Sequence, residues 1–286
     1  MKLAIIGDLH YPDELLSQAQ STKEARDAFY SYFLDRFLSI EADYYISIGD
    51  LAHLGEFSEF KYVLNQLQDR QLQDRFLHAL GNHDTFTYSK TDILTLTRQP
   101  RFTLIEQPDA FLLVLDTARE IREDWSGTMD DEQLVWLSEQ LDRPANKPLL
   151  VFAHHPPHGT TARSTETMMS LDPTLDIWPI LKRWKGFGFY FNGHNHVHSI
   201  VRREQWHFIQ TAAVPDAPAV RVVCVEDGEL RMETIDLSNT ETTEWASLFT
   251  ADMYDYEILP EANGDSTSAS LRVELGQPTE KDGDAE

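Results

Sequence analysis

Cysteine is almost absent from this chain. Among its 286 residues there is one, Cys224, so no disulfide framework can form within the chain. Disulfides persist in oxidising compartments, and a chain without them fits a reducing one best. Cys224 lies in the apolar run VRVVCVE, where we expect it to be a small buried residue of a strand.

Long apolar runs are also lacking. No stretch approaches the roughly 18 consecutive apolar residues that a membrane span needs. The start, MKLAIIGDLH, offers too short an apolar run for a signal peptide, because Asp8 interrupts it. We therefore expect a soluble, cytoplasmic protein that has no membrane partner.

Basic residues are scarce. The chain has 24 Lys and Arg against 48 Asp and Glu, a net charge of −24. Such a surface repels nucleic-acid backbones and anionic membranes, so we expect no nucleic-acid polymer as a partner. An anionic substrate has to be attracted locally, and bound metal ions are one means of doing so.

Apolar residues are present in the amount that a globular core needs, 41% of the chain with 11% aromatic. Helical patterns cover 28–40, 57–70, 129–141 and 173–184. Strand patterns cover 3–7, 43–50, 76–84, 102–117, 148–157 and 187–196, and then SIVRRE, WHFIQTA, AVRVVCVE and ELRMETID. Helices that alternate with strands predict an α/β fold.

The chain changes character near residue 240. Residues 241–286 hold 12 acidic and 2 basic residues, a net charge of −10. We expect a catalytic domain over 1–240 and an acidic C-terminal extension over 241–286 that is partly ordered at most, with NGDSTSAS as a loop or disordered segment. The aromatic stretch 247–259 is expected to dock on the core, and a contact in a homo-oligomer is the alternative.

Five predicted strands end in polar clusters, which read GDLH, GD, GNHD, HH and GHNH. In α/β sheets the carboxyl ends of strands form the binding site, so these clusters should converge on one rim. The candidate residues are Asp8, His10, Asp50, Asn82, His83, Asp84, His154, His155, His194 and His196.

These side chains are carboxylates, imidazoles and an amide, and none is a thiolate. Such a set suits divalent Mn, Fe or Zn. It is too large for one catalytic metal with an open position. Its size fits two metal ions that share a bridging carboxylate, an arrangement used in phosphoryl chemistry.

The order D-x-H, GD, GNHD, H-x-P and GHxH resembles that of the calcineurin-like metallophosphoesterases. The resemblance spans residues 5 to about 200 and implies a four-layer α/β/β/α sandwich with a dinuclear metal centre. It implies that Asp8, His10 and His196 bind one metal, that Asn82, His154 and His194 bind the other, and that Asp50 bridges both. His154 matches the H-x-P pattern, although two adjacent histidines, His154 and His155, cannot be separated by sequence.

The resemblance also places His83 beside the substrate phosphate, as an acid for the leaving oxygen or as a cation that stabilises the transition state. Protein phosphatases of the superfamily carry an Asp that orients this histidine, where this chain has His53, so one orienting group is missing. Asp84 is expected to fix the turn by hydrogen bonds.

Four further histidines have weaker signals. His158 and His198 flank the motifs. The sequence supports two roles for them equally, contact with substrate or a solvated position at the rim of the site. His78 and His207 lie inside strand patterns and are expected to be packed residues.

The stretches GDLAHLGEFSEF and HHPP resemble the cyclic-nucleotide and glycerophosphodiester phosphodiesterase branch, and the protein-phosphatase motifs GD-x-x-D-R-G and GNHE are absent. The resemblance implies a phosphodiesterase that acts on a small diester such as a 3′,5′-cyclic nucleotide, by in-line attack of a hydroxide that bridges the metals. A phosphomonoesterase acting on nucleotides or other small phosphates is the nearest alternative. A non-catalytic binding scaffold is a further alternative.

Overall fold

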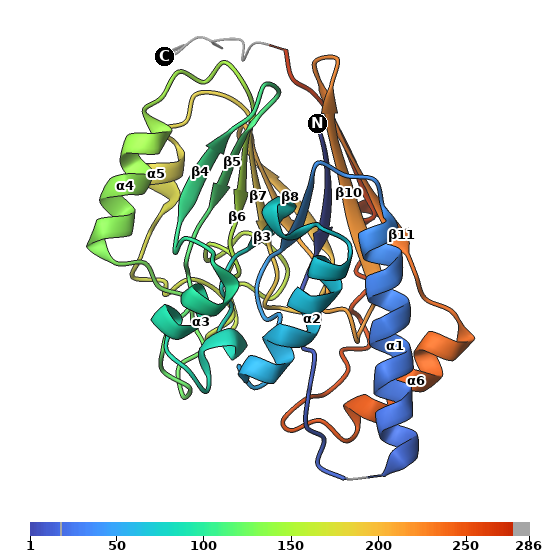
Figure 1. Cartoon of the computed structure of the whole chain (residues 1–286). Helices are drawn as coiled ribbons and strands as arrows, with labels where there is room; N and C mark the ends of the chain where they lie inside the picture. Colours follow the sequence, from blue (N-terminus) through green and yellow to red (C-terminus); the bar gives the residue numbers. More distant parts are fainter. Residues whose placement is uncertain (18, 277–286) are drawn as a thin grey trace.

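Two six-stranded sheets form the centre of the computed structural model, which describes residues 1–17 and 19–276 (Figure 1). The first sheet runs β12 (Ser270–Glu274), β11 (Glu229–Asp236), β10 (Ala219–Glu226), β1 (Lys2–Ile6), β2 (Tyr44–Ser47), β3 (Phe76–His78). Strands β1, β2 and β3 are parallel to one another, and β10 to β12 continue the sheet in antiparallel fashion.

The second sheet has the same number of strands and a parallel centre. In spatial order it runs β4 (Thr103–Glu106), β5 (Phe111–Val114), β6 (Leu149–Phe152), β7 (Gly188–Asn192), β9 (Trp206–Gln210), β8 (Ser199–Arg203). Strands β5, β6, β7 and β9 are parallel, while β4 and β8 pair antiparallel at the two edges.

Helices cover the outer face of each sheet. They are α1 (Gln20–Ser39), α2 (Phe57–Asp69), α3 (Lys90–Thr97), α4 (Asp131–Leu141), α5 (Trp178–Leu181) and α6 (Thr240–Thr250), with short 3-10 turns η1 (Gln73–Arg75), η2 (His83–Thr85) and η3 (Ser266–Ser268). In Figure 1, α4 and α5 lie on one side of the molecule and α1, α2 and α6 on the other. The α/β/β/α sandwich expected from the sequence is therefore confirmed.

Three apolar clusters match the three interfaces between these layers. One lies under α1, α2, α3 and α6, one lies between the sheets and holds residues such as Ile5, Ile46 and Phe152, and one lies under α4 and α5. Each fully buried large apolar side chain contributes about 1.5–3 kcal/mol to folding. These clusters hold the two sheets at a fixed distance, and so they also fix the spacing of the strand ends.

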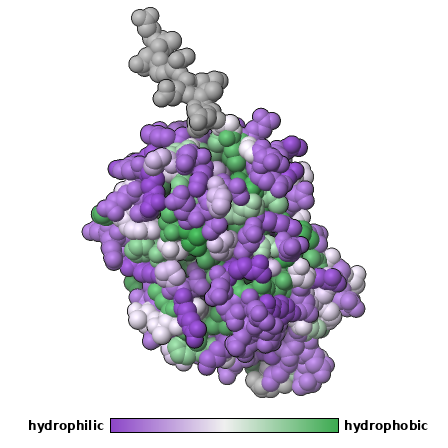
Figure 2. All heavy atoms as spheres, turned by 45° about the horizontal axis from the view of Figure 1, so that its top comes forward, coloured by the Kyte–Doolittle hydropathy of each residue, from purple (hydrophilic) through white to green (hydrophobic). Residues whose placement is uncertain are grey.

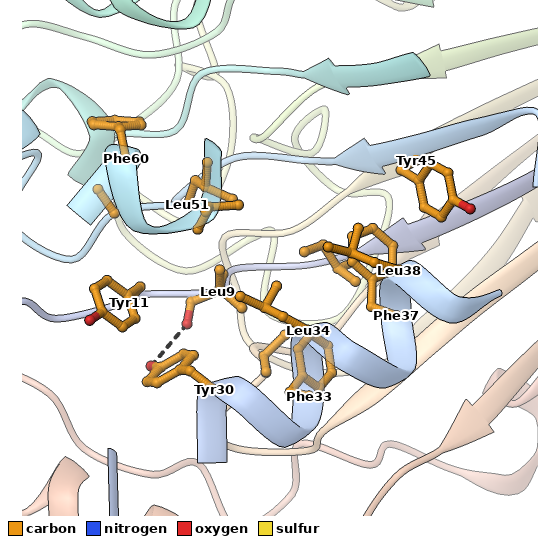
Figure 3. Close-up of a cluster of buried hydrophobic side chains, with 14 of the residues drawn as sticks. Leu9, Tyr11, Tyr30, Phe33, Leu34, Phe37, Leu38, Tyr45, Leu51 and Phe60 are labelled. Carbon is orange, nitrogen blue, oxygen red and sulfur yellow. Dashed lines mark hydrogen bonds between the residues drawn. The ribbon is translucent and has the colours of Figure 1, made fainter. Parts of the chain in front are cut away.

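The buried stripe of α1 explains how one helix reaches the site. Phe33 and Phe37 recur at helical spacing and face the first sheet (Figure 3). One turn earlier, the Tyr30 hydroxyl donates to the backbone oxygens of Leu9 and His10 at 3.1 and 2.8 Å. The helix thereby fixes the backbone that follows β1.

Several element boundaries differ from the sequence prediction. Helix α1 begins at Gln20 rather than at residue 28, because its first two turns are polar and carry no apolar pattern. The helix expected over 173–184 shrinks to α5, since Pro179 cannot continue a helix from an earlier turn. Helix α3 was not predicted. Cys224 was predicted to be buried but is half-buried, because the alternation along β10 points Val223 and Val225 inward.

Residues 240–276 form α6, η3 and β12, and β12 pairs with β11 at the edge of the first sheet. Phe249 and Met253 are buried in the cluster beneath α1, so the aromatic stretch docks on the core as expected. The segment NGDSTSAS, expected as loop or disorder, contains η3 and the first residue of β12. Residues 277–286 lie outside the described residues, and the boundary of the extension stays a prediction.

The surface is largely polar on the face seen in Figure 2. Figure 2 looks onto the end where β1 begins, and hydrophilic residues dominate there with apolar residues in small groups. Within residues 1–17 and 19–276, no helix has the length and apolar character to span a membrane.

Candidate metal centre

The polar residues after five strands do converge, at the edge where the two sheets meet. They follow β1, β2, β3, β6 and β7, whose carboxyl ends point the same way because the strands are parallel within each sheet. Four groups of three side chains each bring one ligand atom per residue within 4.8 Å of the others. They are Asp8, His10 and His196; Asp8, Asp50 and His154; His154, His155 and His194; and His10, His53 and His83. Residues up to 188 positions apart in the chain thus share one site.

Contacts around Asp50 divide the donor atoms into two sets. Asp50 Oδ2 lies 3.1 Å from His154 Nε2 and 3.7 Å from His10 Nε2. On the first side, Asn82 Oδ1 is 3.0 Å from both His154 Nε2 and His194 Nδ1. On the second side, His10 Nε2 is 3.1 Å from His196 Nε2. Asp50 is therefore the carboxylate that borders both sets.

Three of these imidazoles are oriented by a hydrogen bond from the ring nitrogen that faces away from the centre. His154 Nδ1 donates to the Ile48 oxygen at 3.0 Å, and His194 Nε2 donates to the Met168 oxygen at 2.9 Å. His196 Nδ1 donates to Asp216 Oδ2 at 3.0 Å. These partners fix the tautomer, so the remaining nitrogen of each ring presents a lone pair to the centre.

Two motif glycines leave space for carboxylates. A Cβ on Gly81 would lie 2.1 Å from Asp50 Oδ1, and one on Gly193 would lie 2.3 Å from Asp8 Oδ2. Any side chain at either position would displace the carboxylate. The glycines of GNHD and GHNH are therefore part of the site.

The backbone at four of the candidate ligands is left-handed. φ is +47° at His10, +48° at Asp50, +70° at His194 and +58° at His196. Non-glycine residues rarely adopt this region, and each costs of order 1 kcal/mol or more. The surrounding hydrogen bonds and packing sustain this strain, which turns four side chains toward one point.

The electrostatics favour a cation at this point. Burial lowers the pKa of His154, but Asp50 and Asp8 outweigh it and raise the pKa to about 9. Burial and the charge of His154 lower the pKa of His194 to about 3, so that ring stays neutral. Burial opposes ionisation of Asp50, yet His154 and His83 hold its pKa well below the usual range. The buried carboxylates thus stabilise positive charge at His154, while His194 stays a neutral donor.

The donor set fits two divalent metal ions. Ligand atoms about 2.1 Å from one ion lie about 3.0–3.4 Å from one another in octahedral or tetrahedral arrangements, which matches the contacts around Asn82 and His196. His154 faces the centre, whereas His155 uses both ring nitrogens elsewhere. His155 Nδ1 accepts from the Thr117 hydroxyl at 2.9 Å, and His155 Nε2 donates to the Trp125 oxygen at 3.0 Å. The structure therefore favours His154 as the ligand.

His83 lies at the border of the site. Its Nδ1 donates to the backbone oxygen of His53 at 2.7 Å, so a main-chain carbonyl supplies the orienting group that the sequence seemed to lack. The ring of His53 stacks near that of His83, with 5.4 Å between the centroids, and its Nε2 donates to the Tyr254 oxygen at 2.7 Å. Asp84 accepts from the backbone nitrogens of Ala52 and Gly81 at 3.0 and 2.8 Å, which fixes the turn as expected.

Two predicted flanking histidines are not brought into the centre. His158 is exposed and contacts the Ser170 hydroxyl at 3.2 Å. His198 is buried, and its Nδ1 accepts from Arg221 at 3.0 Å. His78 is buried as expected, but it also lies 3.2 Å from Asp84 and so supports the GNHD turn.

Sequence reasoning missed a relay from the C-terminal residues. The Tyr256 hydroxyl donates to Asp216 Oδ1 at 3.0 Å, and Asp216 holds His196. The Tyr256 ring also packs against His10 and His196, with centroid distances of 5.3 and 5.7 Å. Asp216 follows no predicted strand end, and Tyr256 lies in the extension, so no motif marked either residue.

A cavity of about 370 Å³ opens onto the candidate ligands. Its lining is Asp50, Leu54, Asn82, His83, Phe86, Arg122, Trp125, Arg163, Met169, His194, His196, Tyr254 and Asp255. Polar donors of the centre form one wall, and aromatic, apolar and guanidinium groups form the other. The cavity can therefore hold a small molecule with one anionic and one organic part.

Comparisons with known proteins give a family and a curated relative. Residues 1–198 match the family model described as calcineurin-like phosphoesterase. A probable cyclic nucleotide phosphodiesterase of Rhodopseudomonas palustris is 30% identical over 155 residues, which are 53% of this chain and 56% of that protein. The match thus spans little more than half of the relative's length.

Solved structures share the fold at low identity. The crystal structure of a dimetal phosphatase from Danio rerio superposes with a TM-score of 0.60 at 15% identity, covering 83% of this chain and 99% of that one. At this identity the likeness shows the architecture alone.

Proposed function

This chain belongs to the calcineurin-like phosphoesterase family, and on that premise we propose that it is a dinuclear metal-dependent phosphodiesterase. The proposed substrate is a small phosphodiester such as a 3′,5′-cyclic nucleotide. One observation carries the proposal: two carboxylates, one amide and four imidazoles meet in one cluster that shares Asp50 between two sets. The cluster reaches the cavity through Asp50, Asn82, His194 and His196.

We assign the residues as two ligand sets. Asp8, His10 and His196 would hold one ion, Asn82, His154 and His194 would hold the other, and Asp50 borders both sets. When bound, two such ions supply Lewis acidity and lower the pKa of bound water toward about 7. Mn, Fe and Zn all accept this mixture of oxygen and imidazole donors.

His83 is the proposed acid. The bond from its Nδ1 to the His53 oxygen fixes the ring, so Nε2 is the atom that carries a proton to the leaving oxygen. His83 lines the cavity beside Asp50, and its backbone nitrogen donates to Asp50 Oδ1 at 2.8 Å. The same contact aligns acid and candidate bridging ligand.

Two features favour a diester over a monoester. The similar protein of Rhodopseudomonas palustris is named for cyclic-nucleotide phosphodiesterase activity. The cavity also has an organic wall, formed by Leu54, Phe86, Trp125 and Tyr254, that suits the second ester substituent.

The test is metal reconstitution. Protein stripped with EDTA receives Mn, Zn or Fe(II), and hydrolysis of bis-(p-nitrophenyl) phosphate is compared with that of p-nitrophenyl phosphate and of 3′,5′- and 2′,3′-cyclic AMP. We expect metal-restored diester cleavage in the wild type and its loss in Asp50→Asn. Asp116→Asn is the matched control, because Asp116 is equally buried but pairs with Lys90 and Arg101 outside the cavity.

Each other outcome separates the alternatives. A clear preference for the monoester would keep the metal chemistry and overturn the phosphodiesterase assignment. Metal binding without turnover of any ester would leave a binding scaffold as the better description.

A further inference from the structure

The outer wall of the cavity contains an arginine with an unusual environment. The Arg122 guanidinium carbon lies 5.0 Å from the Phe86 ring centroid and 5.4 Å from the Tyr254 ring centroid. Within residues 1–17 and 19–276 this guanidinium makes no hydrogen bond and no ion pair. A side chain with five N–H donors is thus held by two aromatic rings and pairs with no carboxylate of the part of the chain that the structure describes.

Arg163, on the same cavity, shows the contrast. It donates to the Asn195 oxygen at 3.2 Å and to Glu166 at 3.3 Å, so much of its donor capacity is used within the protein. The donors of Arg122 remain available to a ligand in the cavity.

The loop that carries Arg122 is anchored on both sides of it. The Arg119 side chain donates to the Ser126 oxygen at 3.0 Å and to Asp172 at 3.0 Å. The backbone oxygen of Trp125 accepts from His155, yet its side chain is 40% exposed. Fixed backbone with an exposed ring is the arrangement that a stacking surface requires.

The third segment of this wall is fixed in the same way. The backbone oxygen of Tyr254 accepts from His53, while the Tyr254 side chain is 50% exposed. The rings of Phe86, Trp125 and Tyr254 and the free guanidinium of Arg122 therefore line the same cavity as the candidate metal ligands. Under the proposed function those ligands bind the substrate phosphate through the metal ions.

We propose that Phe86, Arg122, Trp125 and Tyr254 form a subsite for the nucleobase of the phosphoester substrate. This inference rests on the proposed function and names the part of the substrate that the outer wall binds. A planar base stacks on the exposed rings, and acceptor atoms at its edge receive the free N–H groups of Arg122. Guanine presents two adjacent acceptors, O6 and N7, that match the guanidinium fork.

The test measures binding to metal-loaded protein by calorimetry, with guanosine 5′-monophosphate and ribose 5-phosphate as probes. The two probes share the sugar phosphate and differ in the base. We expect the nucleotide to bind about 10-fold tighter or more, and Arg122→Ala to remove most of that advantage without changing affinity for ribose 5-phosphate. Arg122→Lys keeps the charge but loses the planar fork, so it is expected to keep only part of the affinity advantage of the nucleotide over ribose 5-phosphate.

Arg36→Ala is the matched control, since Arg36 lies over the Tyr32 ring at 5.4 Å on α1, outside the cavity lining. Equal affinity of the wild type for both probes, or an unchanged difference in Arg122→Ala, would overturn the subsite. Diester hydrolysis tests the proposed function independently of the subsite. If hydrolysis is absent while the base still improves binding, the proposed reaction is wrong and the subsite stands.

Discussion

The two walls of the cavity are built by opposite means. On the metal wall, Asp50 and Asn82 are 1% and 5% exposed, and hydrogen bonds to the main chain orient the imidazoles of His154 and His194. On the outer wall, Trp125 and Tyr254 are 40% and 50% exposed and their rings are free to meet a ligand.

Under the proposed function, this difference separates chemistry from selectivity. The atoms proposed to hold metal ions are fixed by burial, by strained backbone and by second partners. The groups proposed to meet the variable part of a substrate lie on anchored loops with exposed side chains. Substitutions on the metal wall should therefore affect every substrate, and those on the outer wall should affect one class.

The largest effect is expected from His154→Ala. It removes a buried donor shared by Asn82 and Asp50, so metal content should fall and kcat should drop by more than the roughly 100-fold typical of outer partners. His155→Gln is the adjacent control, and it should retain two ions per chain. Metal analysis after gel filtration and rates on one diester check both variants; full metal content in His154→Ala would contradict the ligand assignment.

His83→Ala tests the proposed general acid at the border of the metal wall. Losing a general acid should lower kcat by roughly 10²–10⁴-fold while metal content stays at the wild-type level. The loss should be smaller for p-nitrophenyl esters than for cyclic nucleotides, because p-nitrophenolate leaves without a proton. An equal loss on both substrates would argue for a purely electrostatic role of the imidazolium.

A smaller effect is expected at the relay behind His196. Asp216→Asn should weaken metal binding by roughly 10–100-fold, and Tyr256→Phe should weaken it less, because it removes a single hydroxyl contact. Competition with a coloured chelator measures the affinity directly. Tyr62→Phe, at a ring stacked on Tyr11, is the control, and a weakening as large as in Tyr256→Phe would point to a general packing effect.

The smallest effect is expected at His207, a buried histidine that lies on neither wall, and it concerns the pH dependence of stability. Burial, and then Arg202, lower the pKa of His207 from about 6.5 to about 4. The unfolded chain therefore gains a proton at higher pH than the folded chain, and stability is lost as pH falls from 6.5 toward 4. His207→Phe keeps the stack on Phe189 and should reduce this fall in Tm by about 2–4 °C.

Thermal unfolding followed by circular dichroism at pH 7 and pH 4.5 checks this difference. Identical pH dependence in wild type and His207→Phe would mean that His207 gains its proton without cost in the folded state.

The convergence of the side chains on the metal wall was largely readable from sequence, because each motif sits at a strand end and parallel strands bring such ends together. Their binding of metal stays a prediction. The strands themselves followed from apolar runs such as LAIIG and PLLVFA. Their pairing in two sheets rested on the family resemblance, since nothing local in those runs specifies which strand lies beside which.

The outer wall and the relay could not be predicted. Arg122, Trp125 and Tyr254 become neighbours only through loop geometry, which Arg119 and His155 fix by contacts to main-chain oxygens. Asp216 lies between two prolines in a segment with no periodic pattern, and its bond to His196 depends on where β9 ends. Tertiary contacts of this kind leave no short signature.

The left-handed backbone at His10, Asp50, His194 and His196 also bears on protein engineering. At such positions a glycine relieves conformational strain. A screen for thermal stability alone would therefore select glycine substitutions that remove these four side chains. Improvement of this protein should therefore couple every round of thermal selection to a second selection for bound metal. Stabilising substitutions should be placed in the sheets and helices, away from the four strained positions.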